Sequence, residues 1–342
     1  MESSEEGIGM SENSYSSVKK KAMLGILISV VALVIIFHFT ETRVTWKAIL
    51  RANIYLLLIA FLLQVAFWFF WALRIQYLVF YVGKEVSLSY AMEVTLASGF
   101  LAAITPSSAG GEPLRVKMLY DAGVGAGEST AVVLVERLLD AIFFSIALPV
   151  FVILTGFSMK LGMEVGGAFA LSLAGFLVFL WLLINRPKRL ESLAEWVERL
   201  VAKFSKKRAE GLADRLKEEL IAFRDALVML AKNPRCAFIA LCITVMIWMP
   251  EFLIPSAILA AFGCRPYFLY SITAQLLLVV ISLLPLTPGA SGIAEFGMSY
   301  LYSNFVPQHI IGVLTALWRF ITYYLNLIAG FFVIKKRYID EV

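Results

Sequence analysis

Long runs of apolar residues follow one another along most of the chain, separated by short polar segments. Six of them extend over about 18 or more residues, the length that a helix needs to cross the hydrocarbon core of a membrane. These runs lie at 22–39, 54–82, 128–157, 165–185, 236–262 and 308–334. Two further runs, 88–104 and 267–286, are each cut short by a segment rich in proline and glycine. The pattern predicts an all-α polytopic membrane protein with about six spanning helices and two re-entrant hairpins.

One long polar stretch, 186–235, contains 13 Lys and Arg against 8 Asp and Glu. Its apolar residues recur at helical spacing, at Leu193, Val197, Leu200 and Phe204 and again at Leu212, Leu216, Leu220, Phe223 and Leu227. This spacing predicts an amphipathic helix or helical hairpin on the membrane surface or beneath the bundle. The excess of basic residues places the stretch in the cytoplasm.

The composition agrees with a membrane protein, because 60% of the 342 residues are hydrophobic, 16% are charged and the mean hydropathy is +0.82. Soluble domains carry about 25% charged residues. The three cysteines and two histidines show neither zinc-ligand spacing nor the arrangement of a catalytic triad. No GxxxxGK(S/T) phosphate-binding loop is present. We therefore expect no metal, no cofactor, no ATP-driven step, no enzymatic activity and no nucleic-acid partner.

The cytoplasmic placement of the basic stretch decides the topology, because spanning helices alternate in direction. We expect the basic residues Lys335, Lys336 and Arg337, which follow the last run, on the same cytoplasmic side, together with the N-terminus. The expected location of the protein is the cell membrane. The predicted organisation is a disordered cytoplasmic leader at 1–20, a first membrane half at 21–185 with a hairpin at 88–122, cytoplasmic helices at 186–235, and a second membrane half at 236–335 with a hairpin at 267–304. The first hairpin begins and ends in the cytoplasm and the second outside, so they enter from opposite faces.

The two interrupted segments resemble each other in sequence. Each has a Thr-Pro pair, a glycine five residues after the threonine, a glutamate shortly afterwards and an arginine 32 residues after the threonine. In order, these are Thr105, Pro106, Gly110, Glu112 and Arg137 in the first half, and Thr287, Pro288, Gly292, Glu295 and Arg319 in the second. All except the glutamates, which are displaced by one position, match at a shift of 182 residues. With their opposite orientations, the segments predict an inverted repeat, a recurring architecture of transporters.

Proline removes a backbone N–H and glycine adopts angles that other residues avoid, so each break interrupts a membrane helix. Lipid tails do not tolerate bare peptide groups, and such a break must be buried in protein or border a water-filled cavity. The short helix after the break directs its first N–H groups toward that cavity, which suits a phosphate or carboxylate. A kink that only improves packing is the alternative. Two matched breaks, each followed by an arginine in an apolar run, favour the cavity.

Ionisable residues inside apolar runs are functional candidates, because each costs about 3 kcal/mol to insert at the centre of a membrane. They are Glu136, Arg137, Asp140, Glu251 and Arg319. A local ion pair between Arg137 and Asp140 is one explanation. The other is that Arg137 and Arg319 hold a lipid phosphate. Arg74 lies near a helix end and is expected to snorkel to the membrane interface, where we also expect the aromatic Trp68 and Trp71.

At these residues the chain resembles a known family. The runs ITPSSAGGEPLRVKMLYDAGVGAGESTAVVLVERLLD and LLPLTPGASGIAEFGMSYLY are similar to the two signatures of the lysylphosphatidylglycerol synthase transmembrane-region family, also known as flippase-like domain or UPF0104-type proteins. The resemblance covers nearly the whole chain and implies an activity that moves polar lipids between leaflets. It implies a substrate site formed by Thr105, Pro106, Gly110, Gly111, Glu112, Arg115, Glu136, Arg137 and Asp140, and by Thr287, Pro288, Gly289, Gly292, Glu295 and Arg319. We add Glu251, which lies between Pro250 and Pro255.

The chain departs from the family pattern in two places. Ser107 and Ser108 replace the usual glycine-rich start of the first signature, which makes the backbone there less free. The chain also stops soon after the last apolar run, without the soluble aminoacyl-transfer domain of the fused enzymes. No synthase activity is therefore expected.

The leading hypothesis is a lipid translocase in which two opposed hairpins form a polar cavity near the middle of the bilayer. Its substrate would be an anionic or zwitterionic phospholipid or a polyprenyl phosphate, moved passively or with an ion or proton gradient. The candidates for carrying protons are Glu112, Glu136, Asp140, Glu251 and Glu295.

Two other functions remain open. One is a membrane enzyme acting on a lipid-linked phosphate or sugar with Glu and Asp as acid and base, although no DxD or DDxxD pattern is present. The other is a non-catalytic partner that docks a separate soluble lipid-modifying enzyme through 186–235. A homo-oligomer is compatible with each hypothesis.

Overall fold

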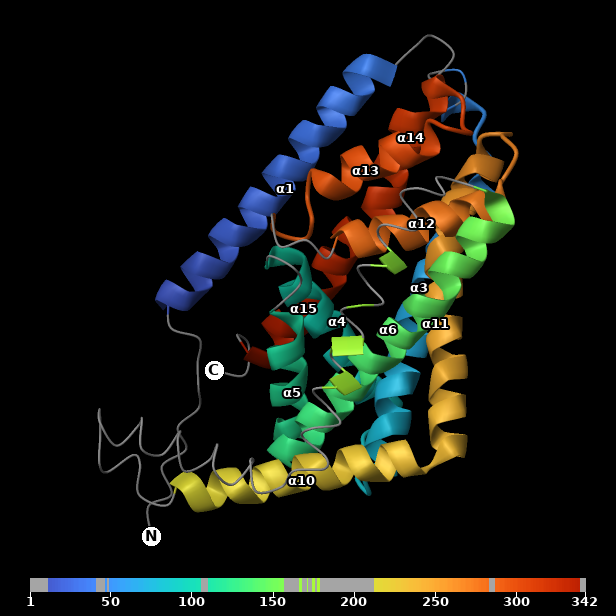
Figure 1. Ribbon diagram of the computed structural model, residues 1–342. Coiled ribbons are helices and arrows are strands. Elements are labelled where there is room, and N and C mark those ends of the chain that lie inside the picture. The colour runs from blue at the N-terminus through green and yellow to red at the C-terminus, as the bar shows by residue number, and fades with distance from the viewer. Residues whose placement is uncertain are drawn as a thin grey trace.

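A computed structural model shows the chain as a bundle of helices (Figure 1). It describes residues 12–40, 47, 49–105, 110–156, 166–167, 171, 174–175, 177–178, 212–282 and 287–338. The helices are α1 (Glu12–Thr40), α3 (Ile54–Tyr81), α4 (Leu88–Ile104), α5 (Gly111–Asp121), α6 (Ala126–Thr155), α10 (Leu212–Lys232), α11 (Pro234–Ala261), α12 (Phe268–Ser282), α13 (Ile293–Tyr302), α14 (Gln308–Arg319), the π-helical turn η1 (Phe320–Tyr324) and α15 (Leu325–Tyr338).

Four helices in the described part of the chain are long and apolar enough to cross a membrane: α3, α6, α11 and the continuous helix formed by α14, η1 and α15. Their bounds lie close to four of the predicted apolar runs. The all-α membrane class is therefore confirmed. The predicted run 165–185 and the first part of the basic stretch, 186–211, lie largely outside the described residues.

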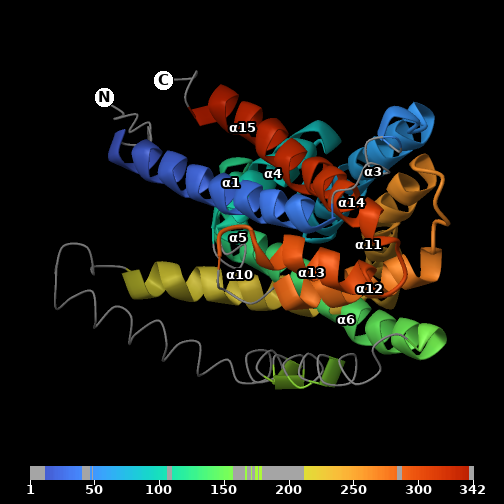
Figure 2. The ribbon, with the colours of Figure 1, turned by 90° about the horizontal axis from the view of Figure 1, so that it is seen from above.

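Helix α1 begins earlier than expected. It starts at Glu12, so the prediction of a disordered leader is wrong for residues 12–20. This stretch contains neither glycine nor proline, the residues least compatible with a helix interior, so the helix of the apolar run extends into it. Within the described residues, the apolar part of α1 is Ile26–Thr40. It lies against α13 and α14, away from the α3–α11 pair (Figure 2).

Two helical hairpins lie inside the bundle, each with a break at the predicted Thr-Pro segment. Helices α4 and α5 flank the first break and contain 17 and 11 residues. Helices α12 and α13 flank the second and contain 15 and 10 residues. Each is shorter than the about 20 residues that usually span a bilayer. Pro106 and residues 283–286 lie outside the described residues.

The two hairpins open toward opposite ends of the molecule (Figure 1). Helices α3 and α11 pack antiparallel, because the Asn53 N–H at the start of α3 donates to the Ala261 carbonyl at the end of α11 at 2.8 Å. Helix α4 therefore begins at the end of the bundle where α11 begins, beside α10. Helix α12 begins at the other end, where α11 stops. The predicted opposite orientation of the two breaks thus agrees with the arrangement of the helices.

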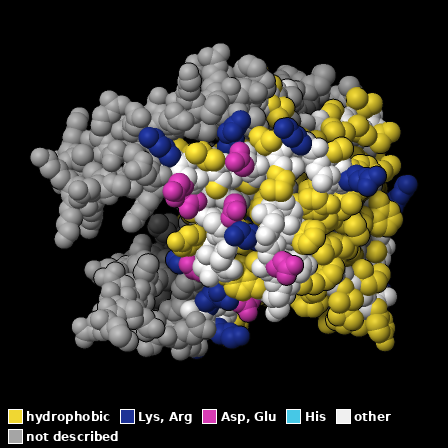
Figure 3. Space-filling view, turned by 90° about the horizontal axis from the view of Figure 1, so that it is seen from below, with side chains coloured by type: hydrophobic (Ala, Val, Ile, Leu, Met, Phe, Trp, Pro, Cys, Tyr) yellow, Lys and Arg dark blue, Asp and Glu magenta, His cyan; other side chains and the backbone are white. Residues whose placement is uncertain are grey.

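Helix α10 confirms the helical prediction for the second part of the basic stretch and lies across the end of the bundle. It buries Ala226 and Leu227 and exposes Asp225, as an amphipathic helix should. Its Glu219 carboxylate accepts a hydrogen bond from the Gly127 N–H at the first turn of α6, at 2.6 Å. Viewed from this end, the molecule shows basic and acidic side chains gathered beside a broad apolar area (Figure 3).

The two halves of the chain repeat each other in structure as well as in sequence. Helices α5 and α13 begin at Gly111 and Ile293, and α6 and α14 begin at Ala126 and Gln308, each pair 182 residues apart. The packing is also reciprocal. Helix α4 packs on α15 and α12 on α6, while α3 packs on α11. Each half thus covers its interrupted helix with the long helix of the other half, as an approximate twofold relation requires.

The two breaks touch each other in the middle of the bundle. The Gly289 N–H donates to the Thr105 carbonyl at 3.3 Å. The Tyr323 hydroxyl donates to the Ala103 carbonyl, at the end of α4, at 3.2 Å. Gly289 has a φ of +55°, a left-handed conformation that favours glycine. The backbone groups freed by one break are therefore partly satisfied by the other break.

Replacing Gly330 with alanine is expected to loosen the packing of α15 on α4. A methyl group there would lie 2.3 Å from the Leu96 carbonyl oxygen and 2.6 Å from Phe100 Cβ. Overpacking of this kind costs about 1–3 kcal/mol, so the midpoint of thermal unfolding in detergent should fall. Gly175→Ala is the matched control, because no atom of the described residues lies within 4 Å of the added methyl group. Equal midpoints for the two variants would contradict this account.

Candidate functional site

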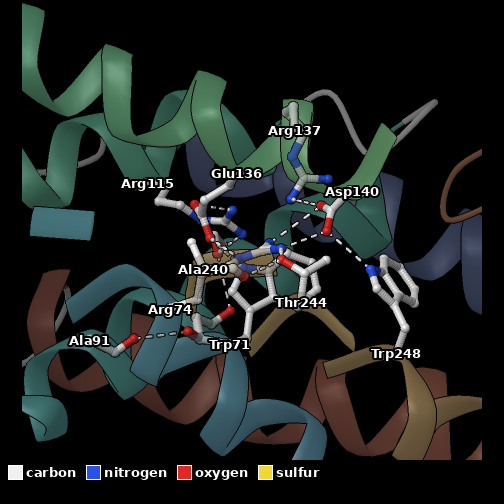
Figure 4. Close-up of polar contacts among 12 residues, drawn as sticks. Trp71, Arg74, Ala91, Arg115, Glu136, Arg137, Asp140, Ala240, Thr244 and Trp248 are labelled. Carbon is white, nitrogen blue, oxygen red and sulfur yellow. Dashed lines mark hydrogen bonds and ion pairs between the residues drawn. The ribbon is translucent and has the colours of Figure 1, made fainter. Parts of the chain in front are cut away.

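Arg74 of α3 lies at the centre of a buried ionic network (Figure 4). Its Nη1 donates to Asp140 Oδ1 at 2.6 Å and to Thr244 Oγ1 at 3.0 Å, and its Nε donates to Glu136 Oε1 at 3.3 Å. The side chain is fully buried. The prediction that Arg74 snorkels to the interface is therefore wrong, because two carboxylates of α6 neutralise it inside the bundle.

A second arginine binds the other oxygen of the same glutamate. Arg115 of α5 donates to Glu136 Oε2 at 2.9 Å and to Ser98 Oγ at 3.0 Å. The indole N–H of Trp71 donates to Glu136 Oε1 at 3.0 Å. Glu136 therefore joins α3, α5 and α6, and Trp71 is part of this network rather than a residue of the membrane interface.

Three guanidinium groups surround one indole ring. The Cζ atoms of Arg74, Arg115 and Arg137 lie 5.5, 5.0 and 5.4 Å from the ring centre of Trp71, within the range of cation–π attraction. We refer to Trp71, Arg74, Arg115, Glu136, Arg137 and Asp140 together as the Trp71 cluster. Like charges at such short separation repel, so the ring and the two carboxylates are what make this arrangement stable.

Arg137 is the most accessible arginine of the Trp71 cluster. Its side chain is 35% exposed, and its Nη2 lies 3.3 Å from Asp140 Oδ2, so the predicted local ion pair is present. Its Nε lies 3.8 Å from Glu112 Oε1, beyond hydrogen-bond distance. Asp140 also accepts a hydrogen bond from the Trp248 indole at 3.0 Å. Arg137 is thus held on one side and free to bind on the other.

The second half contains an equivalent but tighter pair. Arg319, which matches Arg137 in the repeat, donates from Nε to Glu295 Oε1 at 2.7 Å. Its Nη2 donates to the Gly289 carbonyl at 2.9 Å and to Ser291 Oγ at 3.2 Å. Its guanidinium lies 3.9 Å from the ring centre of Tyr323. The π-helical turn η1 begins directly after Arg319, and such widened turns are frequent at functional sites.

Glu295 connects this pair to the first helix of the chain. Its Oε2 accepts the Gly292 N–H at 2.6 Å, a capping contact at the start of α13. Its Oε1 also accepts the Ser29 hydroxyl, and Ser29 Oγ accepts the Tyr324 hydroxyl at 2.9 Å. Glu295 is fully buried. In both halves, therefore, an acidic residue in the first turn after the break pairs with the arginine of the next long helix.

A cavity of about 380 Å³ lies between the two halves. Aromatic residues, polar residues of both hairpins and charged residues form its wall. Seven predicted site residues line it: Gly111, Glu112, Arg115, Arg137, Glu251, Gly289 and Arg319. The structure therefore brings the interrupted segments and the arginines of both halves to one polar space.

The other predicted residues either bind the arginines that line the cavity or lie in the two breaks. Glu136, Asp140 and Glu295 bind the arginines. The Thr105 hydroxyl accepts the Gly110 N–H at 2.9 Å across the first break. The predicted site residues that do not line the cavity are Thr105, Gly110, Glu136, Asp140, Thr287, Pro288, Gly292 and Glu295, and Pro106 lies outside the described residues.

The helices, the paired breaks and the shared charged cavity define a polytopic helical membrane protein built from two similar halves. The profile of the family "Lysylphosphatidylglycerol synthase TM region" matches residues 22–330, and the chain belongs to this family. The resemblance found in the sequence is thereby confirmed.

The sequence is similar to membrane proteins of several organisms. A UPF0104 membrane protein of Archaeoglobus fulgidus is 49% identical over 309 residues, which cover 90% of this chain and 94% of the relative. A UPF0104 membrane protein of Pyrococcus horikoshii is 24% identical over 332 residues, which cover 93% of this chain and 98% of the relative. A UPF0104 membrane protein of Methanothermobacter thermautotrophicus is 26% identical over 293 residues, which cover 84% of this chain and 86% of the relative. These matches extend over nearly the full length of each protein.

Proposed function

We propose that this protein moves the polar headgroups of membrane lipids, anionic ones above all, from one leaflet to the other through the central cavity. The observation that carries the proposal is the set of arginines in the cavity wall. Arg115, Arg137 and Arg319 come from both halves of the chain and line the same space, and the Arg137 side chain is 35% exposed. A guanidinium group binds a phosphate of a lipid headgroup with charge-assisted hydrogen bonds.

The size and position of the cavity support a headgroup rather than a whole lipid. A volume of about 380 Å³ falls in the range of roughly 300–1,000 Å³ that holds small ligands. It accommodates a phosphate with a small substituent, while the acyl chains stay in the surrounding lipid. Movement of a headgroup makes and breaks no covalent bond. In agreement with this function, Glu136, Asp140 and Glu295 are held by arginines.

The repeat provides a route for alternating access. The hairpins α4–α5 and α12–α13 open at opposite ends, and the arginines of the long helices that follow them, Arg137 and Arg319, line the same space. In this structure Arg137 is partly exposed and its contact with Glu112 is loose, whereas Arg319 is buried against Glu295. The two equivalent pairs thus differ, as they would in a conformation open on one side. The excess of basic residues in the stretch that contains α10 supports a cytoplasmic position for that end. The cell membrane is the location that we propose for the protein.

The test reconstitutes the protein into liposomes that contain phosphatidylglycerol with a fluorescent label on an acyl chain. The measurement is the decrease in fluorescence as labelled lipid reaches the outer leaflet, where a membrane-impermeant quencher acts on it. The wild type should accelerate lipid movement above that of protein-free liposomes. Arg137→Ala should slow it about tenfold or more, because one hydrogen bond to a charged group contributes about 1.5–3 kcal/mol. Arg319→Lys, which keeps the charge but loses the forked donors, should also be slower.

Arg235→Ala is the matched control, because Arg235 is exposed at the start of α11 and does not line the cavity. It should move lipid at the wild-type rate. A wild-type protein as inert as empty liposomes, with phosphatidylglycerol, phosphatidylethanolamine and a polyprenyl phosphate alike, would overturn the proposal.

A further inference from the structure

Five carboxylates lie in or directly behind the cavity wall, and one of them differs from the rest. Four have an arginine nitrogen within 4 Å. These four are Glu112, Glu136, Asp140 and Glu295. Glu251 of α11 has no lysine or arginine within that distance among the described residues, although it lines the cavity and is partly buried. It is therefore the carboxylate whose charge the protein does not balance.

The immediate partners of Glu251 are neutral. The buried amide of Gln64 is oriented by its two neighbours, so that its NH₂ donates to Glu251 Oε2 at 3.2 Å and its carbonyl accepts the Trp68 indole N–H at 3.0 Å. Gln64, which bonds to Glu251, and Trp68, which bonds to Gln64, both lie on α3, and α3 packs along α11. A neutral donor of this kind binds a carboxylate or a carboxylic acid, since either form offers an acceptor oxygen.

The charges on the surrounding helices are already engaged. Helix α12 carries no charged residue between Phe268 and Ser282. The charged groups on the other helices around this part of α11 are Arg74 of α3, Glu136, Arg137 and Asp140 of α6, Arg319 of α14, and Glu112 and Arg115 of α5 across the cavity. Each of them has an oppositely charged partner within 4 Å. The four arginines are matched by four carboxylates, Glu112, Glu136, Asp140 and Glu295, so an ionised Glu251 adds a negative charge that none of these arginines balances.

An ionised and unpaired Glu251 would oppose the entry of an anionic headgroup. Like charges repel, and the repulsion is stronger inside a protein than in bulk water. A proton on Glu251 removes this repulsion. We propose, on the basis of the function proposed above, that Glu251 binds a proton together with the anionic headgroup, so that the protein is a proton–lipid symporter.

The cycle is balanced in charge and protons. At one side of the membrane, an oxygen of Glu251 takes a proton from water as the headgroup binds beside Arg137 and Arg319. At the other side, the headgroup leaves and the O–H bond breaks, returning the proton to water. One proton and one anionic headgroup therefore move in the same direction, without net transfer of charge for a singly charged lipid. A difference of one pH unit should then drive about a tenfold accumulation of lipid in the more alkaline leaflet.

The test uses liposomes with labelled phosphatidylglycerol and a pH difference across the membrane. For the wild type, lipid should move from the acidic to the alkaline leaflet, and collapsing the gradient with a protonophore should abolish this accumulation. Glu251→Gln mimics the protonated form, so it should still exchange lipid but lose the response to the gradient. Glu251→Asp keeps a titratable group and should therefore keep the response to the gradient. Glu218→Gln, on the exposed face of α10, is the control and should behave as the wild type.

The failures are distinguishable. A wild type that moves no lipid at any pH overturns the proposed function itself. A wild type that exchanges lipid but does not respond to the gradient, or a Glu251→Gln variant that responds fully, overturns the proton site and leaves the translocase intact. The Glu251→Gln variant could instead fail to move only lipids with an amine in the headgroup, while phosphatidylglycerol still followed the gradient. Glu251 would then be a site for an ammonium group, and the proton proposal would be wrong.

Discussion

Replacing Arg74 with leucine is expected to destabilise the protein more than any other single substitution in the bundle. The change leaves Asp140 and Glu136 buried with one guanidinium fewer and removes four hydrogen bonds to the Arg74 side chain. Breaking a buried ion pair by removing one partner costs about 3–5 kcal/mol. Much of the free energy of unfolding would be lost, so the variant should unfold at a far lower temperature in detergent or fail to accumulate.

The cause can be separated from the loss of a large side chain. The double variant Arg74→Leu and Asp140→Asn removes one charge of each sign and leaves Glu136 paired with Arg115, so it should recover a substantial part of the stability. Arg235→Leu, at an exposed position, should change the unfolding midpoint little. If Arg74→Leu were as stable as the wild type, the Trp71 cluster would not hold α3 against α6.

The helices could be predicted because their cause is local. Apolar length alone determines that α3, α6 and α11 exist, and the predicted runs differ from the observed bounds by two residues or fewer at each end. The breaks after Ile104 and before Ile293 were equally predictable, since Pro and Gly act on the backbone of their own segment. The shift of 182 residues found in a few side chains also relates the starts of whole helices.

The charged site was predictable only in part, because its contacts join distant segments. Arg137 and Arg319 were recognised from their place in the repeat. The central role of Arg74 depends on Glu136 and Asp140, 62 and 66 residues further along the chain, and no periodicity reports such a pair. Ser29 reaches Glu295 across 266 residues. The position of Arg74 inside an apolar run was the available signal, and its short distance from the helix end suggested the wrong explanation.

Replacing Gly289 with alanine is expected to produce the second large effect, because it separates the two breaks. The added methyl group would lie 2.4 Å from the Ala103 carbonyl oxygen and 2.6 Å from Tyr323 Cε2. Both neighbours are rigid, since one is backbone and the other belongs to the ring stacked on Arg319. The left-handed backbone adds about 1–2 kcal/mol for a residue with a Cβ atom, and overpacking adds about 1–3 kcal/mol.

Gly156→Ala separates these two contributions. Gly156 has a φ of +63°, close to the +55° of Gly289, but within the described part of the chain no atom lies within 4 Å of its added methyl group. The free energy of unfolding of Gly156→Ala should fall only by the cost of the left-handed backbone, and this variant should move lipid at the wild-type rate. Gly289→Ala should unfold at a lower temperature than Gly156→Ala and should also lose lipid movement, because Arg319 bonds to the Gly289 carbonyl and shifts with it. Equal stability and equal transport in the two variants would mean that the contact between the breaks is incidental. A loss confined to Gly289→Ala would instead show that the two halves depend on each other at the point where the cavity is formed.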